Sequence, residues 1–275
     1  MERVLILVKT YPVISSTYIE LVCTAGMRED GTWVRIYPVS FRRMNEESKY
    51  KKYQWVSLEL KKRDQDFRPE SYSPVNLDSM KLGEIVDRWE DRWKVIRKSR
   101  IFTNMNELVR LSKKENGALS LAVFKPSKIK RFVVRKTESQ WPKEKLEKIE
   151  QWRRQGTLLD DENDEEIRRT FQIVEKIPYS FSYEFEDDAG TLHRMSIEDW
   201  ETGILFLKCR RYCATEKLAV EQVRAKYEEM SRSEHLHLYL GTVFENHQKG
   251  YPNPFSIIGM FAPKRMSNDI QETLF

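Results

Sequence analysis

Four side chains in this sequence have the types and positions that acid–base or nucleophilic chemistry requires. Glu20 lies in an alternating segment, Glu70 follows a proline, Asp199 opens a helical segment, and Lys9 ends an apolar run. A carboxylate beside a sugar can stabilise oxocarbenium character or position a water molecule. A lysine amine can form a Schiff base with an opened sugar. We therefore take Glu20, Glu70, Asp199 and Lys9 as candidate catalytic residues.

Each carboxylate also has an ordinary structural explanation, and these alternatives stay open at this point. Glu20 can form a cross-strand pair with Arg35. A proline next to Glu70 fits a rigid surface turn. Ser196 lies three residues before Asp199, which is the spacing of a capping box at the start of a helix.

A second group of residues combines aromatic rings with cationic and hydroxyl side chains near predicted strand ends. Side chains two positions apart on a strand share a face, so Tyr18 is expected beside Glu20, and Trp33 beside Arg35. Rings of this kind stack on bases, and arginine pairs with phosphate. The candidate nucleic-acid-binding residues are Tyr11, Ser16, Tyr18, Trp33, Arg35, Tyr37, Arg42 and Arg68.

The charge of the chain is strongly polarised. Its first 140 residues contain 29 Lys and Arg against 18 Asp and Glu, a net charge of +11, whereas the remaining 135 residues have a net charge of −6. A basic half with aromatic residues on its strands is typical of a surface that follows phosphates and stacks bases. The charge therefore predicts a polyanionic partner for the N-terminal half, without deciding between binding and cleavage.

Several common enzyme classes lack their motifs in this sequence. There is no Walker loop, no GxGxxG after a predicted strand, no GxSxG and no HExxH. ATPases, dinucleotide-dependent oxidoreductases, serine hydrolases of the GxSxG type and zincins therefore have no support, and we expect neither a cofactor nor a metal. A weaker alternative is a zinc site built on Cys209 and Cys213, one helical turn apart, with His193, His235 or His237.

The predicted elements of the N-terminal part are short strands. Residues 4–8 form a continuous apolar run, and residues 18–23 alternate before a turn that leads into residues 32–37. Residues 53–60 also alternate, and residues 119–126 and 129–134 read as two further strands around a proline. A curved sheet of five or six such strands most naturally closes as a small OB-like barrel.

The fold class expected from this pattern is α+β with mostly antiparallel sheets. We predict a basic, β-rich, OB-like nucleic-acid-binding module over residues 1–140 and a second α+β module over residues 173–275. Between them, residues 141–172 read as a helical and acidic linker or insertion, with its acidic run at 160–166. In the second module, a hairpin over 181–195 is followed by two helices and two closing strands.

The sequence favours a cytoplasmic protein. No stretch approaches the roughly 20 apolar residues of a membrane helix, and Met1 leads directly into a strand-like segment rather than a signal peptide. The three cysteines are an odd number and do not suggest a disulfide framework. We expect free thiols, no membrane partner, and a protein partner only as an open alternative.

Seven segments together carry a resemblance to a known family: residues 9–12 (KTYP), 18–26, 33–38 (WVRIYP), 68–71 (RPES), 199–201 (DWE), 241–242 and 254–259 (PFSIIG). Over nearly its whole length the chain resembles a bacterial family described as dual OB-containing and associated with genome-conflict and phage-defence loci. The resemblance implies two OB-like modules and a nucleic-acid target, and it supplies no mechanism. The acidic second half fits poorly with two equivalent DNA-binding barrels.

These observations lead to one functional hypothesis and its rivals. The first is an antiphage DNA glycosylase that hydrolyses the N-glycosidic bond of a natural or modified base flipped out of the duplex, since this chemistry needs a pocket, rings and a carboxylate but no metal. The alternative is a non-catalytic reader of foreign or modified nucleic acid that signals to a partner protein. A metal-dependent nuclease ranks third because no carboxylate–lysine cluster is recognisable, and an RNA target stays open.

Overall fold

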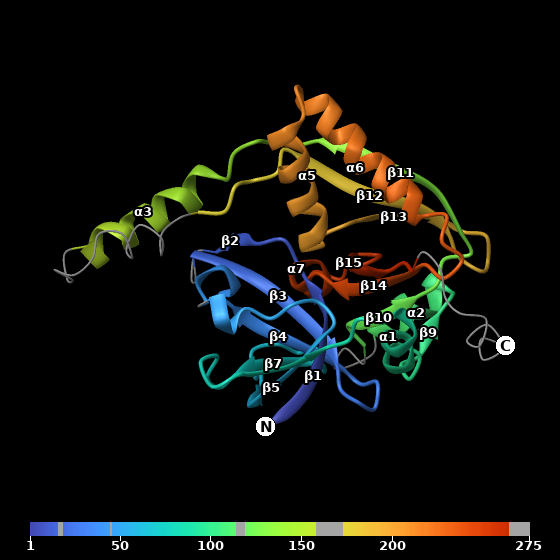
Figure 1. The fold of residues 1–275 in the computed structure, drawn as a ribbon, viewed down its shortest axis with the longest axis horizontal. Helices are drawn as coiled ribbons and strands as arrows, with labels where there is room; N and C mark the ends of the chain where they lie inside the picture. Colours follow the sequence, from blue (N-terminus) through green and yellow to red (C-terminus); the bar gives the residue numbers. More distant parts are fainter. Residues whose placement is uncertain (16–18, 45, 114–118, 158–172, 264–275) are drawn as a thin grey trace.

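The computed structural model describes residues 1–263 apart from 16–18, 45, 114–118 and 158–172. It is an α+β structure with mixed sheets, in which strands of two modules pack against each other and helices cover the second module (Figure 1). None of the helices in these described ranges is long and apolar enough to cross a membrane. The predicted acidic run at 160–166 lies outside the described residues.

The N-terminal part forms one curved sheet, an open half-barrel (Figure 1). Seven strands follow the order β6-β7-β4-β3-β1-β5-β8, and β2 pairs with β3 beside this path. The pair β4 and β7 is parallel, whereas β1 is antiparallel to both of its neighbours. The strands are β1 (Glu2–Lys9), β2 (Val13–Ser15), β3 (Ile19–Met27), β4 (Trp33–Val39), β5 (Gln54–Leu58), β6 (Leu60–Lys62), β7 (Ser71–Pro74) and β8 (Lys81–Ile85).

The continuous apolar run of β1 is explained by burial on both faces of the sheet. Val4 and Ile6 pack into a core on one face, whereas Leu5 and Leu7 pack on the opposite face. The core around Leu5 and Leu7 also contains residues of the second module, Tyr239 among them. A strand covered on both faces has no solvent-facing positions, so it reads as an unbroken apolar run rather than an alternating one.

The second module contains two sheets and most of the helices. A four-stranded sheet has the order β15-β14-β10-β9, and a three-stranded sheet has the order β11-β12-β13. Their strands are β9 (Ile101–Phe102), β10 (Leu121–Phe124), β11 (Lys128–Lys136), β12 (Tyr179–Glu186), β13 (Leu192–Ser196), β14 (His237–Thr242) and β15 (Phe255–Phe261). The helices within the described residues are η1 (Phe41–Arg43), η2 (Glu46–Ser48), α1 (Trp89–Ile96), α2 (Met105–Ser112), α3 (Lys143–Thr157), α5 (Trp200–Tyr212), α6 (Glu216–Met230) and α7 (Phe244–Gln248).

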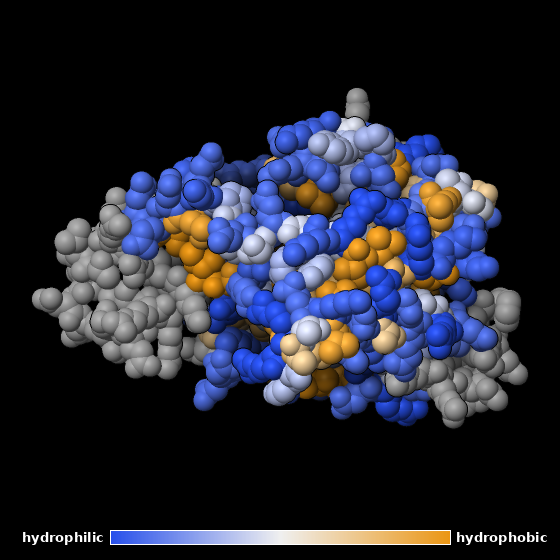
Figure 2. All heavy atoms as spheres, turned by 90° about the horizontal axis from the view of Figure 1, so that it is seen from above, coloured by the Kyte–Doolittle hydropathy of each residue, from blue (hydrophilic) through white to orange (hydrophobic). Residues whose placement is uncertain are grey.

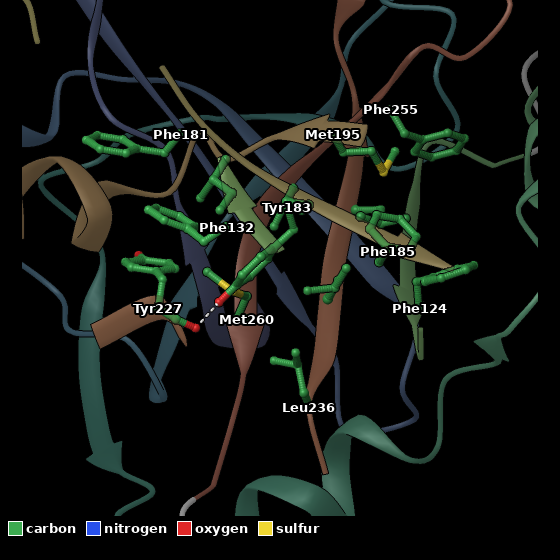
Figure 3. Packing of buried hydrophobic residues seen from close by; sticks show 14 of the residues in the cluster. Phe124, Phe132, Phe181, Tyr183, Phe185, Met195, Tyr227, Leu236, Phe255 and Met260 are labelled. Carbon is green, nitrogen blue, oxygen red and sulfur yellow. Dashed lines mark hydrogen bonds between the residues drawn. The ribbon is translucent and has the colours of Figure 1, made fainter. Parts of the chain in front are cut away.

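An aromatic core joins the three-stranded sheet to α5, α6 and the four-stranded sheet (Figure 3). The rings of Phe132 and Tyr227 are stacked with their centres 4.9 Å apart. The Tyr183 hydroxyl donates a 2.6 Å hydrogen bond to the backbone oxygen of Tyr227, so this buried polar tip has a partner. The pair ties β12 to α6 and so fixes the helix that lines one wall of the cavity described below.

The N-terminal sheet differs from the expected small barrel in two ways. Among the described strands, its edge strands β6 and β8 are not paired with each other, so the sheet is open. The strands predicted at 119–126 and 129–134 do form, but β10 pairs with β14, and β11 pairs with β12. These strands complete the second module because their apolar faces belong to its cores.

His237 on β14 makes the stability of the protein sensitive to acid. Its ring is buried 4.7 Å from that of Trp93, and its Nδ1 is 2.9 Å from the His235 backbone oxygen. Burial lowers the pKa of His237 to about 4, from 6.5. Below pH 6.5 the unfolded chain therefore takes up a proton that the folded chain excludes, and the free energy of unfolding falls by about 3 kcal/mol down to pH 4.

We expect this loss to disappear in the variant His237→Asn, whose amide can still donate to the His235 oxygen. Urea unfolding of both proteins at pH 7, 5.5 and 4 measures the difference. A variant whose stability falls with pH as steeply as that of the parent would show that His237 is not the responsible group.

Candidate active site

A cavity of about 1050 Å³ lies between the two modules. The N-terminal module contributes the end of β1, the turn before β5 and the start of α1, and the second module contributes α5, the end of α6 and the end of β15. Its walls are largely apolar, with the side chains of Trp89, Trp200, Met230 and Met260. Nine of the lining residues are charged, and they come from both modules. A cavity of this size in which polar groups converge beside apolar surface is a candidate site for a ligand or substrate.

The backbone places Asp199 next to the end of β1. Asp199 is the N-cap of α5, and its carboxylate accepts a hydrogen bond from the Glu201 backbone nitrogen at 3.3 Å. A backbone bridge pairs Thr10 with Asp199, and the Tyr11 nitrogen donates to the Glu198 oxygen at 2.8 Å. The predicted capping box based on Ser196 is wrong, because Ser196 is the last residue of β13 and α5 begins at Trp200, with the carboxylate of Asp199 itself as its N-cap.

Lys52 connects the two modules through an ion-pair cluster. Its Nζ lies 2.8 Å from Oε2 of Glu201 and 3.6 Å from Oδ2 of Asp199. Burial alone would lower the pKa of Lys52, but the charges of the two carboxylates outweigh it and raise this pKa. Lys52 is therefore a permanent cation at neutral pH, and it holds the start of α5 against the N-terminal sheet.

The carboxylate of Asp199 is almost completely buried, with 3% of the residue exposed. Burial raises the pKa of Asp199 to about 6, even though Lys52 acts in the opposite direction. A carboxylate with a pKa near 6 can both accept and return a proton close to neutral pH. Together with its position on the cavity wall, this makes Asp199 the strongest acid–base candidate in the site.

Lys9 also lines the cavity, so the structure brings two predicted catalytic residues together. The Nζ of Lys9 lies 4.3 Å from the ring centre of Phe41 and 5.6 Å from that of Trp200. It donates a long hydrogen bond of 3.4 Å to the Tyr50 backbone oxygen. Burial lowers the pKa of Lys9.

Cationic side chains surround the remaining part of the cavity. Lys51, Lys208, Lys226 and Arg232 all line it, and Lys226 is paired with Glu229 at 3.2 Å. In the part of the chain that the structure describes, Lys51, Lys208 and Arg232 have no ion-pair partner. Unpaired cations beside a cavity attract anionic groups such as phosphate.

The other predicted carboxylates lie outside this cavity and are used in packing. Glu20 is buried and pairs with Arg42 at 2.5 Å, rather than with Arg35 as the structural alternative expected. Glu70 accepts hydrogen bonds from the backbone nitrogen of Ser120 at 2.9 Å and from its hydroxyl at 2.7 Å. Glu70 therefore ties the N-terminal sheet to the strand β10 of the second module.

Two predicted phosphate-binding arginines are buried in the same contact between modules. Arg68 forms hydrogen bonds with both carboxylate oxygens of Asp66, at 2.8 and 2.6 Å, and its Nη1 donates to the Thr242 oxygen at 2.9 Å. Arg35 donates to the Ser120 backbone oxygen at 3.2 Å and to Cys23 Sγ at 3.3 Å. In this conformation neither guanidinium faces solvent.

The predicted stacking rings are dispersed rather than gathered on one exposed sheet face. Trp33 is buried against Tyr239, with ring centres 5.8 Å apart. Tyr37 is half-buried and stacks with Arg63 at 5.0 Å. Tyr11 donates from its hydroxyl to the Glu175 oxygen at 2.8 Å. The predicted binding residues Ser16 and Tyr18 lie outside the described residues.

Sequence reasoning missed Lys52 and Tyr227 as members of the site. Tyr227 shares a hydrogen bond with the hydroxyl of Thr202, and burial raises the pKa of the tyrosine. Glu201 was visible as part of the segment 199–201, but nothing in the segment 50–53 distinguishes Lys52 from other surface lysines. Only the packing of α5 against the N-terminal sheet gives Lys52 its two carboxylate partners.

Potential metal ligands do not gather in the described ranges. These ranges contain no group of three or more His, Cys, Asp or Glu side chains arranged to hold a metal ion. Cys209 and Cys213 are free thiols at the end of α5, and His193 is hydrogen-bonded to Asp187 at 3.1 Å.

The fold and the cavity define a two-module α+β protein in which Asp199 and Lys9 line a cavity between the modules. Residues 101–275 match the family described as Domain of unknown function (DUF8757), and residues 1–98 match Domain of unknown function (DUF8758). The chain belongs to the DUF8757 family, whose model covers more than half of it. A comparison with curated proteins found no match. The two models meet at residues 98–101, whereas the charge pattern placed the division after residue 140.

Proposed function

We propose that the protein is a DNA glycosylase that hydrolyses an N-glycosidic bond in the cavity between its modules. One observation carries the proposal: the buried carboxylate of Asp199, with a pKa of about 6, lies on the wall of a cavity of about 1050 Å³ that is also lined by aromatic, aliphatic and cationic side chains and by the carboxylates of Glu201 and Glu229. Cleavage of an N-glycosidic bond needs such a carboxylate in a pocket that admits one extruded base.

The described side chains can be assigned distinct roles in this reaction. The ionised Asp199 stabilises the positive charge that develops on the sugar and accepts a proton from the attacking water. Lys52 holds Asp199 and Glu201 in position through its ion pairs. The rings of Trp89 and Trp200 supply apolar surface for the base.

The cations beside the cavity fit a substrate that carries phosphates. Lys51, Lys208 and Arg232 line the cavity without ion-pair partners among the described residues. Their charge adds to that of the basic N-terminal half, which has a net charge of +11 over residues 1–140. A polyanion is therefore drawn to this side of the site, as expected for a strand of DNA.

The biological setting is part of the same proposal and rests on the resemblance to the dual OB-containing family. That resemblance supports an antiphage role, an OB-like use of the curved N-terminal sheet, and phage DNA with modified bases as the target. The proposal places the protein in the bacterial cytoplasm, where such DNA enters.

The proposed activity is tested with oligonucleotide duplexes and single strands that carry natural or modified bases. The protein should release a free base, which liquid chromatography detects, and should leave alkali-labile sites in the strand. Tight binding without base release on every substrate would reject the glycosylase and favour the non-catalytic reader. Activity that requires a divalent cation would point instead to a nuclease.

We expect substitutions of the unpaired cations to weaken DNA binding in a salt-dependent way. In Lys208→Gln and Arg232→Gln, the loss of one phosphate contact should reduce the slope of log K against log salt by about 1 and weaken binding uniformly across sequences. Fluorescence anisotropy between 50 and 200 mM salt (roughly the range where such contacts matter) measures both effects.

The matched control for these two variants is Lys217→Gln, which removes an exposed lysine at the start of α6, away from the cavity lining. Equal slopes for all three variants and the parent would show that the cavity cations do not contact the DNA backbone.

A further inference from the structure

Two lysines line the cavity, and they differ in how closely the carboxylates of Asp199 and Glu201 approach them. Lys52 is held between two carboxylates, at 2.8 Å from Glu201 and 3.6 Å from Asp199. Lys9 has no carboxylate within ion-pair distance in the part of the chain that the structure describes, and its Nζ lies against the rings of Phe41 and Trp200. The cavity therefore contains one lysine that is ion-paired, Lys52, and one whose amine lies against aromatic rings, Lys9.

The hydrogen bonds of Lys9 favour loss of its proton. A lysine ammonium has three N–H donors, and the only acceptor found for Lys9 among the described residues is the Tyr50 oxygen, at 3.4 Å. Ring faces attract the charge but do not replace the missing acceptors. Burial lowers the pKa of Lys9 although the charges of Glu201 and Asp199 act in the opposite direction, whereas at Lys52 the same two carboxylates outweigh burial and raise the pKa. Of the two, only Lys9 has the environment of a nucleophilic amine.

Figure 2 shows the face of the molecule above α5 and α6, where hydrophilic residues alternate with separate hydrophobic patches. A polar surface of this kind is an ordinary solvated exterior, and lysines of α6 such as Lys217 are exposed. Lys9 differs from those lysines because it lies inside the cavity, on β1, beside the buried start of α5.

We infer that Lys9 is a covalent nucleophile toward the sugar of the substrate, which would make the enzyme a lyase as well as a glycosylase. This inference rests on the proposed function and adds a second activity to it. Water first releases the base as proposed above, which leaves an abasic deoxyribose whose open form has an aldehyde at C1′. The Lys9 amine then adds to this aldehyde, and the C1′–O double bond becomes a single bond as the new C–N bond forms.

The remaining steps follow from the chemistry of an amine attached to C1′. The C1′ oxygen takes up a proton from solvent and leaves as water, and the nitrogen and C1′ form a protonated imine. Loss of a proton from C2′ then breaks the C3′–O bond, and the 3′ phosphate leaves with its electron pair. Water hydrolyses the imine, which frees the amine of Lys9 and nicks the strand. No oxidant or external reductant takes part.

The test uses an oligonucleotide with one preformed abasic deoxyribose, whose open form is an aldehyde, and sodium cyanoborohydride. The reductant converts an imine into a stable secondary amine, and peptide mass spectrometry then locates the adduct. We expect a one-to-one adduct on Lys9 and nicking of the abasic strand without reductant. The variant Lys9→Met should lose at least nine-tenths of both, while circular dichroism shows an unchanged fold.

The control variant Lys217→Met removes an exposed lysine on α6 and should keep the full adduct. Absence of an adduct, an adduct spread over surface lysines, or equal trapping by Lys9→Met would overturn the inference. Because the abasic strand needs no base release, its trapping is independent of the glycosylase step. Base release from intact DNA without trapping would leave the proposed function standing and reject only the nucleophile.

Discussion

Replacing Asp199 with asparagine should lower the rate of base release by about 10³-fold, within the range that a positioned acid–base group contributes. The amide cannot accept the proton of the attacking water, nor can it offset positive charge on the sugar. The effect is measured as the single-turnover rate on a substrate that the parent cleaves. Near pH 6 the parent rate should itself rise with pH, because Asp199, whose pKa is about 6, becomes ionised.

The substitution Asp199→Asn is informative because it leaves the structural role of the residue in place. Asparagine is as good an N-cap as aspartate, so α5 should still begin at Trp200, and the amide oxygen of the new side chain should accept the same capping bond from the Glu201 nitrogen. The control Asp78→Asn changes an exposed aspartate in a loop between β7 and β8. If Asp199→Asn and Asp78→Asn retain equal activity, Asp199 is a capping residue only.

Replacing Lys52 with methionine should lower the free energy of unfolding by about 3–5 kcal/mol, which is the cost of leaving a buried charge without its partner. Methionine preserves the length and much of the volume of the side chain, so lost packing contributes little. The carboxylate of Asp199, a residue that is 3% exposed, then loses the Lys52 ammonium that lies 3.6 Å from its Oδ2. Urea unfolding at pH 8 measures the loss.

The direction of the pH dependence separates this explanation from a simple packing defect. Without Lys52 the pKa of Asp199 in the folded protein rises further, while its unfolded value stays near 3.8. The free energy of unfolding therefore falls as pH rises from the unfolded pKa to the raised folded pKa, because the folded state resists ionisation of the carboxyl. The variant should therefore be closer in stability to the parent at pH 5 than at pH 8.

A double variant provides the decisive comparison for Lys52. Lys52→Met together with Asp199→Asn removes the cation and the buried anion at once, so it should be more stable than Lys52→Met alone and show no such pH dependence. Loss of Lys52 destabilises the Glu201 carboxylate less than that of Asp199, because the Glu201 side chain is 56% exposed and water can solvate it. A double variant that loses the sum of both single effects would mean that the two side chains do not interact.

The contact between the modules explains why the sequence assigned several side chains to DNA that the structure uses for packing. Arg35, Arg68 and Glu70 all reach residues of the second module, at Ser120 and Thr242. A basic or acidic residue at a strand end gives the same sequence pattern whether its side chain faces solvent or packs against another module. Charge patterns alone cannot distinguish these cases, because the burial of these side chains depends on residues fifty or more positions away.

The sequence by itself determined the local elements and one half of the site. The apolar run of β1, the strand β15 and the polar start of α5 follow from periodicity and capping, which depend on neighbouring residues. For the same reason Lys9 and Asp199 stood out, one at the end of a strand and one at the start of a helix.

Only the tertiary structure decided that these two residues share a cavity and that Lys52 joins them. The tertiary structure also shows that the N-terminal sheet is open and that β10 and β11 pair with strands of the second module. The physical reason is the range of the interactions. Helix caps and strand periods are set within a few residues, whereas the pairing of strands and the desolvation of Asp199 depend on contacts between segments about 150 to 190 residues apart.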